Sequence, residues 1–295
     1  MKKYIAIDIG GTYVKYGLIT EKGVINKKDK IETERNSFEK FLNDIDRIIK
    51  NFNIDIHGIC ISMPGKVDFK NGIAITGGAL RFIDHTPLQE ILQNRYHVQV
   101  SIANDGHCAT LAELWQGSLK NCQNGACIVF GTGIGGGIVI NNELIEGTHF
   151  ASGEFSCLIT NYETPDLQHF LGTRCSTRAM LRKYNQKKGT TVDGYYFFNQ
   201  VRKGNVESLE VYQLFLKEIS ASLYTIQSII DCKKIAIGGG ISELDFLVPD
   251  ITYALEQQFD NYIGFPIEKP EIVKCVFEND ANLIGALKYH LKKYK

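Results

Sequence analysis

The sequence lacks an excess of charge of either sign. Its 295 residues include 33 basic and 33 acidic ones, so the formal net charge is zero. Surfaces that bind nucleic acid or an anionic membrane are usually built from an excess of lysine and arginine. The charge balance therefore predicts that neither nucleic acid nor a membrane is a partner of this chain.

Long apolar runs and low-complexity segments are also missing. The longest apolar stretches are shorter than the roughly 20 residues that a helix needs to cross a bilayer. A predicted strand begins at Tyr4, almost at the start of the chain, so we expect no signal peptide. Together these absences predict a cytoplasmic protein.

The cysteines lack the spacing of a local metal site, because no pair forms C-x-x-C or C-x-C. Such spacings are typical of zinc sites. Disulfides are not expected in a chain without a secretion signal. We therefore expect reduced thiols at all eight positions, which are 60, 108, 122, 127, 157, 175, 232 and 275.

Predicted strands and helices alternate along the chain, which is typical of an α/β protein. Strands are predicted at 4–9, 14–19, 24–27, 56–62, 73–76, 98–102, 234–237 and 272–277, and as a pair within 127–141. Helices are predicted at 37–52, 87–96, 107–116, 166–184, 206–231 and 279–291, and in the segment after 240. For the first helix Asn36 is the predicted N-cap, and the fourth is expected to break near Gly172. A polar stretch at 117–124 is the predicted boundary between two lobes.

Two similar stretches open these lobes. Tyr4–Ile19 (YIAIDIGGTYVKYGLI) and Cys127–Asn141 (CIVFGTGIGGGIVIN) each carry an apolar run, a glycine-rich turn and a second apolar run. Glycine lets the main chain approach a ligand closely and present N–H groups to an anion. A tight turn without a ligand is the alternative for any one cluster. Three clusters, at 10–11, 131–137 and 238–240, favour a shared phosphate site.

The second turn satisfies G-x-G-x-x-G through Gly131, Gly133 and Gly136. The dinucleotide-binding form of this motif requires a helix after the glycines. The residues that follow, IVINNELI, are β-branched and contain a turn, so they predict a strand. The motif therefore does not indicate a Rossmann dehydrogenase.

Asp8 stands directly before the first turn. A carboxylate beside phosphates is repelled unless a cation lies between them, so Asp8 indicates Mg²⁺. An aspartate that only stabilises the turn is the alternative. Lys15 either contacts a phosphate or is a solvated charge on a strand, and we favour the second interpretation.

At this point the motifs resemble those of the ROK family (repressors, open reading frames, kinases) of sugar kinases. The matching stretches are DIGGT at 8–12, SMPGKVD at 62–68, ANDGHCATLAE at 103–113, GTGIGGGIV at 131–139, ASGEF at 151–155, IGGGIS at 237–242 and ENDANLIGAL at 278–287. They keep the family's order and span nearly the whole chain. The resemblance implies a two-lobed actin-like ATPase (ribonuclease H-like) fold of class α/β, with a mixed sheet in each lobe and with ATP and sugar in the interlobe cleft. It implies lobes at 1–118 and 119–278, with the C-terminal helix at 279–295 joining the first.

The resemblance also implies roles for particular residues. Asp105 matches the catalytic aspartate, which acts as general base, and Asn104, Glu154 and Gly65 are carried over as sugar-binding positions. The nucleotide-binding positions are Asp8, Gly10, Gly11, Thr12, Thr132, Gly133, Gly239 and Gly240, with Asp8 also the Mg²⁺ ligand. Asp105 alone would more commonly be read as a helix N-cap. The accompanying pattern favours catalysis, because phosphoryl transfer needs a base, a metal and phosphate donors.

The sequence departs from the family after Glu154. Many members have ExGH followed by a zinc-binding cysteine cluster, whereas this chain has Cys157 in place of the histidine and only Cys175 in the cluster region. We therefore expect no structural zinc. A second sugar-binding glutamate has no clear counterpart here, so pocket residues at 157–175 are not predicted.

The stretches GGALRFID at 77–84 and Glu113-Leu114-Trp115 are most similar to those of β-glucoside kinases. This predicts an ATP-dependent kinase for the 6-hydroxyl of a hexose or β-glucoside, with N-acetylmannosamine kinase and glucokinase as alternatives. Arg81 either reaches the sugar or is a surface residue. A catalytically inactive sugar-binding regulator is the alternative from a different class. Dimers are common in the family, so we expect a homodimer.

Overall fold

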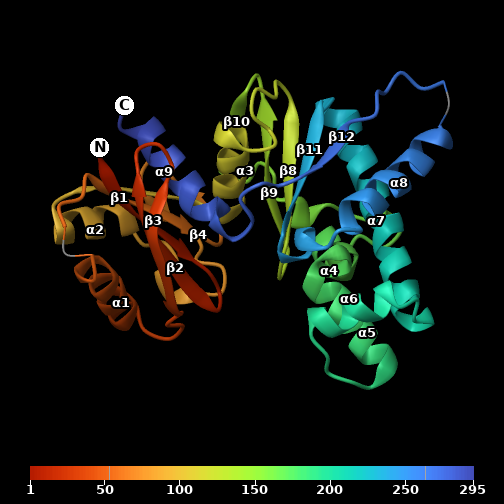
Figure 1. Ribbon diagram of the computed structural model, residues 1–295, viewed down its shortest axis with the longest axis horizontal. Coiled ribbons are helices and arrows are strands. Elements are labelled where there is room, and N and C mark those ends of the chain that lie inside the picture. Colours follow the sequence, from red (N-terminus) through yellow and green to blue (C-terminus); the bar gives the residue numbers. More distant parts are fainter. Residues whose placement is uncertain (53, 263) are drawn as a thin grey trace. The chain divides into compact units, whose positions relative to one another are not determined.

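The computed structural model describes residues 1–52, 54–262 and 264–295. The chain forms two units, each built around its own five-stranded sheet (Figure 1). Unit 1 comprises Met1–Lys120, Leu144–Ser152 and Asn279–Lys295, and unit 2 comprises Asn121–Glu143 and Gly153–Glu278. The two ends of the chain therefore belong to the same unit.

The sheet of unit 1 has the strand order β3-β2-β1-β4-β7. Its strands are β1 (Lys3–Ile9), β2 (Tyr13–Thr20), β3 (Ile25–Glu32), β4 (Gly58–Met63) and β7 (Gln99–Asn104), and a small separate hairpin is formed by β5 (Val67–Asp68) and β6 (Ile73–Ala74). The first three strands are antiparallel neighbours, whereas β4 and β7 run parallel to β1. Every residue of β4 is buried, as expected for a strand that is covered on both faces.

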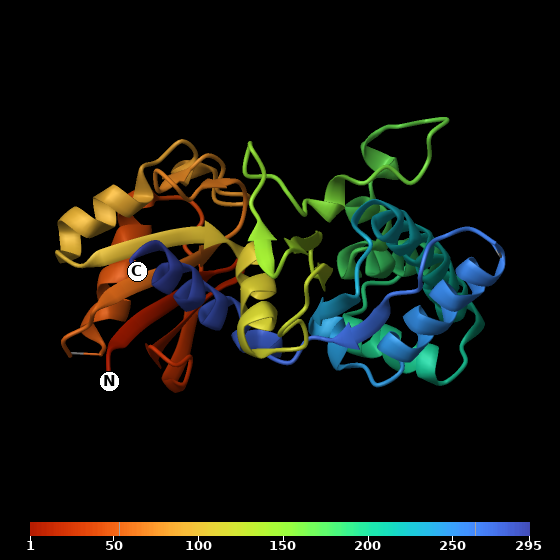
Figure 2. The ribbon, with the colours of Figure 1, turned by 90° about the horizontal axis from the view of Figure 1, so that it is seen from above.

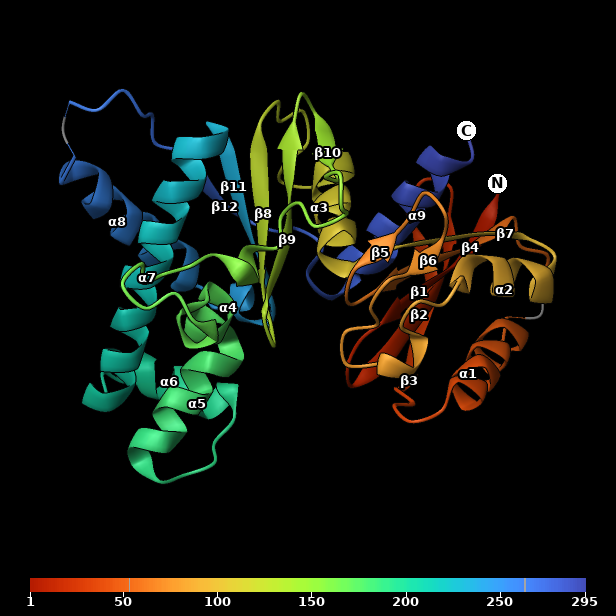
Figure 3. The same cartoon turned by 180° about the vertical axis from the view of Figure 1, so that it is seen from behind.

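Helices cover both faces of this sheet. They are α1 (Phe38–Lys50), α2 (Leu88–Tyr96), α3 (Asp105–Gln116) and α9 (Ala281–Lys293), with a short 3-10 turn η1 at Arg81–Ile83. On one face α3 and α9 pack side by side against β4 and β7 (Figures 1 and 2), and α1 and α2 lie on the other (Figure 3). The two helices α3 and α9 approach closely because Gly285 has no side chain. A Cβ there would lie 1.7 Å from the carbonyl oxygen of Cys108.

The sheet of unit 2 has the order β10-β9-β8-β11-β12. Its strands are β8 (Gly125–Phe130), β9 (Ile134–Ile140), β10 (Glu143–Ile145), β11 (Lys234–Gly239) and β12 (Glu271–Lys274). As in unit 1, the first pair is antiparallel and the last two strands run parallel to the central one. Asn141 and Asn142 join β9 to β10 with positive φ angles of 53° and 61°, which is the geometry of a two-residue hairpin turn.

The helices of unit 2 gather around one long element. They are α4 (Leu171–Cys175), α5 (Thr177–Lys188), α6 (Gly194–Arg202), α7 (Val206–Ile230) and α8 (Leu247–Asp260), with 3-10 turns η2 (Phe155–Cys157), η3 (Leu167–His169) and η4 (Gly240–Glu243). The shorter helices α4, α5 and α6 pack against α7 (Figure 3). Phe130, Phe197 and Phe215 are among the largest fully buried side chains of this core.

The two sheets repeat one plan. In each, a glycine turn joins the central strand to its antiparallel neighbour, and two later parallel strands are added on the other side. In each unit a helix connects those two parallel strands along the chain, α2 in unit 1 and α8 in unit 2. The predicted α/β class with a mixed sheet in each half is confirmed, and the similar openings of the two halves reflect the same topology.

Several predicted boundaries differ from the observed ones. The first helix is capped by Ser37, whose Oγ accepts from the Lys40 N–H at 3.3 Å, and not by Asn36. The Asn36 N–H instead donates to the Glu34 carboxylate at 2.7 Å, which turns the chain before the helix begins. The strand predicted at 24–27 extends to Glu32, although most residues of β3 are exposed. The lysines of β3 are typical of an edge strand. They do not alternate with apolar residues, so the sequence pattern did not predict the full length of this strand.

The helix predicted over 166–184 is divided into η3, α4 and α5. The breaks fall at Phe170 and Ser176, which are extended with ψ angles of 141° and 159°, and not at Gly172, which lies inside α4. Ser176 Oγ accepts from the Ala179 N–H at 3.1 Å and so begins α5. The helix α6 was not predicted, because its aromatic-rich sequence GYYFFNQVR has weak helical preference.

Within the described residues, no helix combines the length and apolar character that crossing a bilayer requires.

A buried histidine on α9 stands out in the core of unit 1. His290 is 1% exposed, and its Nδ1 lies 3.0 Å from Ser101 Oγ. Its Nε2 has no hydrogen-bond partner among the described residues. Burial, assisted by the charge of Lys293, lowers the pKa of His290 to about 4 from an ordinary 6.5.

We expect His290 to make folding sensitive to acid. Below pH 6.5 the unfolded chain binds a proton that the folded chain takes up only near pH 4, so stability is lost as the pH falls between these values. As the pH falls from 7 to 4.5, this histidine should lower the free energy of unfolding by about 2 kcal/mol. Urea unfolding of His290→Gln should show a pH dependence smaller by about that amount. His149→Gln, at an exposed histidine, is the control, and equal pH dependence in both variants would contradict the expectation.

Candidate functional site

In unit 1 the predicted site residues gather where the parallel strands end. Asp8 lies near the end of β1 and is 7% exposed. Its Oδ1 accepts hydrogen bonds from Ser62 Oγ on β4 and from Asn282 Nδ2 on α9, both at 2.9 Å. Burial raises the pKa of Asp8, while these two hydrogen bonds and the charge of Lys15 act in the opposite direction. The carboxylate is thus held in one orientation by a strand and by the C-terminal helix.

Lys15 makes a hydrogen bond at the exposed surface of unit 1. It lies opposite Asp8 in the β1–β2 register, and its Nζ donates to Asn279 Oδ1 at 3.0 Å. Arg81, the other side chain of open role, is exposed at the start of η1.

The first glycine turn follows Asp8 directly. The Gly10 N–H donates to the Tyr13 carbonyl at 3.0 Å, which closes the turn. A Cβ on Gly10 would lie 2.8 Å from that carbonyl oxygen, whereas a Cβ on Gly11 would meet nothing within 4 Å. Gly11 and Thr12 are exposed. The fold therefore explains the glycine at position 10, whereas packing within the described residues does not require a glycine at position 11.

Asn104, Asp105 and Gly65 lie together at the end of β7. Asn104 is the N-cap of α3: its Oδ1 accepts from the His107 N–H at 3.0 Å, and its Nδ2 donates to the Gly65 carbonyl at 2.9 Å. Gly65 has a φ of 86°, and a Cβ there would lie 2.3 Å from the Thr76 carbonyl oxygen. The capping role that competes with catalysis for Asp105 thus belongs to its neighbour.

Asp105 is the first residue of α3. Its Oδ1 accepts from the Gly106 N–H at 2.8 Å. The positive end of the helix dipole stabilises a negative charge at this position. Asp105 is therefore placed at a sheet edge, with its carboxylate oriented by its own helix.

His107 is a residue of this site that sequence reasoning missed. It is buried in the first turn of α3, and its Nε2 lies 2.8 Å from the Ser152 carbonyl oxygen. Burial lowers the pKa of His107. This contact holds the segment that leads to Glu154. Only its place within the ANDGHCA stretch pointed to it, because Ser152 is 45 residues away along the chain.

In unit 2 the second and third glycine turns are neighbours at one sheet edge. Phe130, which precedes the turn at 131–133, pairs with Gly239 across the parallel strands β8 and β11. Gly239 has a φ of 91°, and a Cβ there would lie 2.0 Å from the Phe130 carbonyl oxygen. The predicted residues Thr132 and Gly133 therefore follow a strand whose last residue pairs with Gly239, next to Gly240 in the chain.

A serine that was not predicted anchors the second turn. Ser156 Oγ accepts from the Ile134 N–H at 2.8 Å and donates to the Ile134 carbonyl at 3.0 Å. A Cβ on Gly133 would lie 3.0 Å from the same Oγ, and one on Gly172 would lie 2.5 Å from it. Ser156 therefore connects the turn, the η2 segment and α4.

Glu154 lies immediately before η2, and its side chain is accessible to solvent. Neighbouring residues nevertheless desolvate part of its carboxyl group, which raises the pKa of Glu154. It follows Gly153, which has a φ of 80° and whose Cβ would lie 2.7 Å from the Gly137 Cα on β9. Close packing on the β9 glycines therefore places Glu154 beside the sheet that carries the second turn.

The segment at 157–175, for which no pocket residues were predicted, consists of a connection from η2 followed by η3 and α4. The Leu171 N–H donates to the Leu158 carbonyl at 2.7 Å, and the Thr160 N–H donates to the His169 carbonyl at 2.8 Å. At its end Arg174 pairs with Glu218 of α7, and Cys175 Sγ donates to the same carboxylate at 3.2 Å. The described residues contain no group of three or more His, Cys, Asp or Glu side chains arranged to hold a metal ion.

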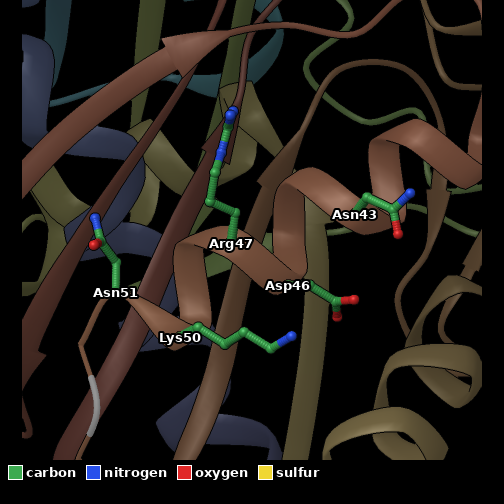
Figure 4. A pocket seen from close by; sticks show the side chains of 5 residues that line it. All are labelled: Asn43, Asp46, Arg47, Lys50 and Asn51. Atoms are coloured by element: carbon green, nitrogen blue, oxygen red, sulfur yellow. The ribbon is translucent and has the colours of Figure 1, made fainter.

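A hollow of about 480 Å³ lies on α1 and is lined by Asn43, Asp46, Arg47, Lys50 and Asn51 (Figure 4). Its Asp46 is already paired with Arg95 of α2 and accepts from Tyr96 OH at 2.6 Å. These bonds lower the pKa of Asp46 to about 2. The hollow contains none of the predicted site residues, so we do not assign the active site to it.

Known proteins share this arrangement of strands and turns. The sequence model of the ROK family matches residues 4–293. A β-glucoside kinase from Klebsiella pneumoniae is 31% identical over 303 residues, covering 99% of this chain and 96% of that protein. The chain therefore belongs to the ROK family.

Solved structures agree with this assignment. A ROK family protein from Streptococcus pneumoniae in complex with sucrose has a TM-score of 0.90 and 32% identity, covering 99% of this chain and 98% of that one. A ROK family glucokinase from Streptomyces griseus, in complex with glucose and AMPPNP, has a TM-score of 0.82 at 22% identity over 97% of this chain and 98% of that one, which shows the fold alone. The predicted actin-like ATPase fold is confirmed.

Two adjacent glycines should respond differently to alanine. Gly239→Ala should lower the melting temperature, because it forces a side chain into a positive φ and against the Phe130 carbonyl. Gly240→Ala should leave the melting temperature unchanged, because a Cβ there meets nothing within 4 Å. If a nucleotide approaches this turn, Gly240→Ala should still weaken nucleotide binding in calorimetry. Unchanged binding by Gly240→Ala would argue against that approach.

Proposed function

We propose that this protein is an ATP-dependent sugar kinase that phosphorylates the 6-hydroxyl of a β-glucoside or hexose, with Asp105 as the general base. The observation that carries the proposal is the position of Asp105 within unit 1. It begins α3 at the sheet edge that also holds Asp8 and the first glycine turn, beside an asparagine that takes over the capping role. The proposal thus assigns the base, the phosphate contacts and the Mg²⁺ ligand to residues at one edge of the sheet.

In the proposed reaction the oxygen of the sugar hydroxyl attacks the γ-phosphorus of ATP and forms a new bond to it. The Asp105 carboxylate accepts the proton of that hydroxyl. The bond between that phosphorus and the bridging oxygen breaks, and ADP leaves with the electron pair. A carboxylate is a suitable base because the hydroxyl becomes acidic only as the new bond forms. The positive end of the α3 dipole favours the ionised carboxylate.

Each unit carries its own set of proposed residues. Unit 1, with the lobe boundary proposed near residue 118, supplies Asp105, Asn104, Gly65, and the first phosphate turn at 10–12. Unit 2 supplies Thr132 and Gly133 for the phosphates, Gly239 and Gly240 near the adenosine, and Glu154 for sugar hydroxyls. Support comes from the strand ends: in unit 1 Asp8 and Asn104 lie at the ends of parallel strands, and in unit 2 Phe130, just before the second turn, pairs with Gly239.

Asp8 fits a role in holding Mg²⁺. This ion is usually bound by one or two carboxylates, by water and by substrate phosphates, rather than by a full protein cage. In Asp8 both described hydrogen bonds fall on Oδ1 and come from neutral donors. When bound, Mg²⁺ would offset the negative charge of the ATP phosphates.

We propose a β-glucoside as the preferred substrate because the Klebsiella pneumoniae relative is a β-glucoside kinase of nearly the same length. The structure from Streptococcus pneumoniae holds a disaccharide, sucrose, which supports a pocket for more than one sugar unit. N-acetylmannosamine and glucose are the alternative substrates. The choice depends on the loop at 157–175, where the family pattern ends.

We further propose a cytoplasmic homodimer without structural zinc, nucleic acid or membrane among its partners. Cys157 occupies the position of the family's zinc-linked histidine, and the Cys175 thiol is engaged by Glu218, which supports the absence of zinc. Elemental analysis and light scattering of the purified protein test the two main points; stoichiometric zinc or a monomeric mass would refute them.

Replacing Asp105 by asparagine should abolish transfer and preserve binding. The amide oxygen can still accept from the Gly106 N–H, so the start of α3 should remain intact. We expect kcat to fall by about 10²- to 10⁴-fold, with a sugar dissociation constant close to that of the unchanged protein. Asp193→Asn is the matched control, because Asp193 also binds a backbone amide at a helix start, in α6. A near-normal rate for Asp105→Asn would refute the assignment.

A coupled ADP-release screen should identify the substrate. We expect the highest kcat/KM for cellobiose among glucose, cellobiose, N-acetylglucosamine, N-acetylmannosamine, fructose and allose, with NMR showing phosphate at the 6-position. A clear preference for N-acetylmannosamine or glucose would favour the alternative kinases. Sugar binding without turnover of any sugar would instead support an inactive regulator.

A further inference from the structure

Thr33 packs against the first glycine turn and donates two hydrogen bonds to its carbonyl oxygens. This residue follows β3 and is 9% exposed. Its Oγ1 donates to the Gly10 carbonyl at 2.7 Å, and its N–H donates to the Thr12 carbonyl at 3.0 Å. One side chain and its own backbone therefore occupy two carbonyl oxygens of the turn.

The other side of the turn has the opposite character. Gly11 and Thr12 are exposed, and within the described parts of the chain neither of their N–H groups donates to a protein acceptor. The Gly10 N–H, by contrast, is used by the Tyr13 carbonyl. The turn thus offers amide hydrogens to solvent while its carbonyls at 10 and 12 are engaged by Thr33.

The geometry of the peptide bond links these two observations. The chain contains no cis peptide bond among its described residues, and in a trans peptide unit the C=O and N–H point in opposite directions. Holding the Gly10 carbonyl toward Thr33 therefore turns the Gly11 N–H away from Thr33, toward the exposed side. A carbonyl on that side would repel a phosphate, whereas an amide hydrogen attracts it.

We infer that Thr33 is a positioning residue for nucleotide binding: its hydroxyl holds the Gly10 carbonyl back, so that the Gly11 N–H is presented to a phosphate of ATP. This inference rests on the proposed function. Thr33 itself does not contact the ligand and acts only through the turn. It lies 23 residues beyond Gly10, outside the motif that predicts the phosphate site.

The hydroxyl group is the part of Thr33 that carries this role. The bond from the Thr33 N–H to the Thr12 carbonyl continues the β2–β3 ladder beyond the pair Tyr13↔Glu32, and any residue except proline would keep it. Thr33→Val removes the hydroxyl bond and keeps both the shape and the backbone bond. Thr33→Ser keeps the hydroxyl.

Thr20 provides a matched control in the same unit. It is also a buried threonine, 4% exposed, and its Oγ1 accepts from the Val24 N–H at 3.3 Å in the turn at the other end of β2. Thr20→Val therefore removes a comparable bond to a turn without touching residues 10–12. Both valine variants should lower the melting temperature by similar amounts.

The test is direct binding of AMPPNP with Mg²⁺, measured by calorimetry without sugar, together with separate KM values for ATP and sugar. Thr33→Val should bind AMPPNP about three- to tenfold more weakly, which corresponds to one hydrogen bond to the backbone. Its KM for ATP should rise while its KM for sugar stays constant. Thr33→Ser should restore binding to within about twofold, and Thr20→Val should bind like the unchanged protein.

Equal AMPPNP binding by Thr33→Val and the unchanged protein would overturn the inference and leave the proposed function standing. Loss of binding by Thr20→Val as large as that by Thr33→Val would also overturn it, since the effect would then be one of stability. Absence of AMPPNP binding by the unchanged protein would overturn the proposed function and the inference together.

Discussion

A main chain can hold a phosphate only where its amide hydrogens face the anion and its carbonyl oxygens do not. In each unit, a hydroxyl side chain from a later segment hydrogen-bonds to the backbone at the glycine turn that follows the central strand. Thr33 engages the Gly10 carbonyl in unit 1, and Ser156 engages both backbone groups of Ile134 in unit 2. Glycine gives these turns conformational freedom, and the hydroxyl groups hydrogen-bond to the backbone there.

The sheet topology brings the turns to the same places in both units. The carboxyl ends of parallel strands meet at one edge, where Asp8, Ser62 and Asn104 end up as neighbours. In unit 2 the same rule places the Phe130 carbonyl against Gly239, so close that no side chain fits between the strands. Gly238 has a related constraint, since a Cβ there would lie 2.9 Å from Cys275 Sγ. The packing of the sheet therefore requires glycine at both positions, whatever ligand the turn binds.

The sequence predicted the parts of the site that depend on local pattern. Apolar runs that end in glycine, such as that before Gly10, identified the strands and turns, and seven ordered motifs identified the ROK family, which the family match confirms. The same apolar runs predicted the α/β class with two mixed sheets, which the observed strand orders confirm. The assigned roles of Asp105, Glu154 and the other site residues stay predictions, because the comparisons do not test them.

Contacts between distant segments could not be predicted in this way. His107 and Ser152, Thr33 and Gly10, and Arg174 and Glu218 each meet across tens of residues, and neither member of any pair has a local pattern that points to the other. The predicted start of the first helix was also wrong, because it depends on which side chain binds a backbone N–H. At the first helix Glu34 takes the Asn36 N–H, and the cap moves to Ser37.

The exchange of roles between Asn104 and Asp105 has a consequence for sugar recognition. An amide side chain offers two N–H donors and two lone pairs on its oxygen. Among the described residues, Asn104 uses one donor on the Gly65 carbonyl and one lone pair on the His107 N–H, which leaves one of each without a protein partner. Because both bonds already fix its orientation, a hydroxyl that binds there need not order the side chain. Under the proposed function, the residue that caps the helix also positions a sugar hydroxyl beside the carboxylate of Asp105.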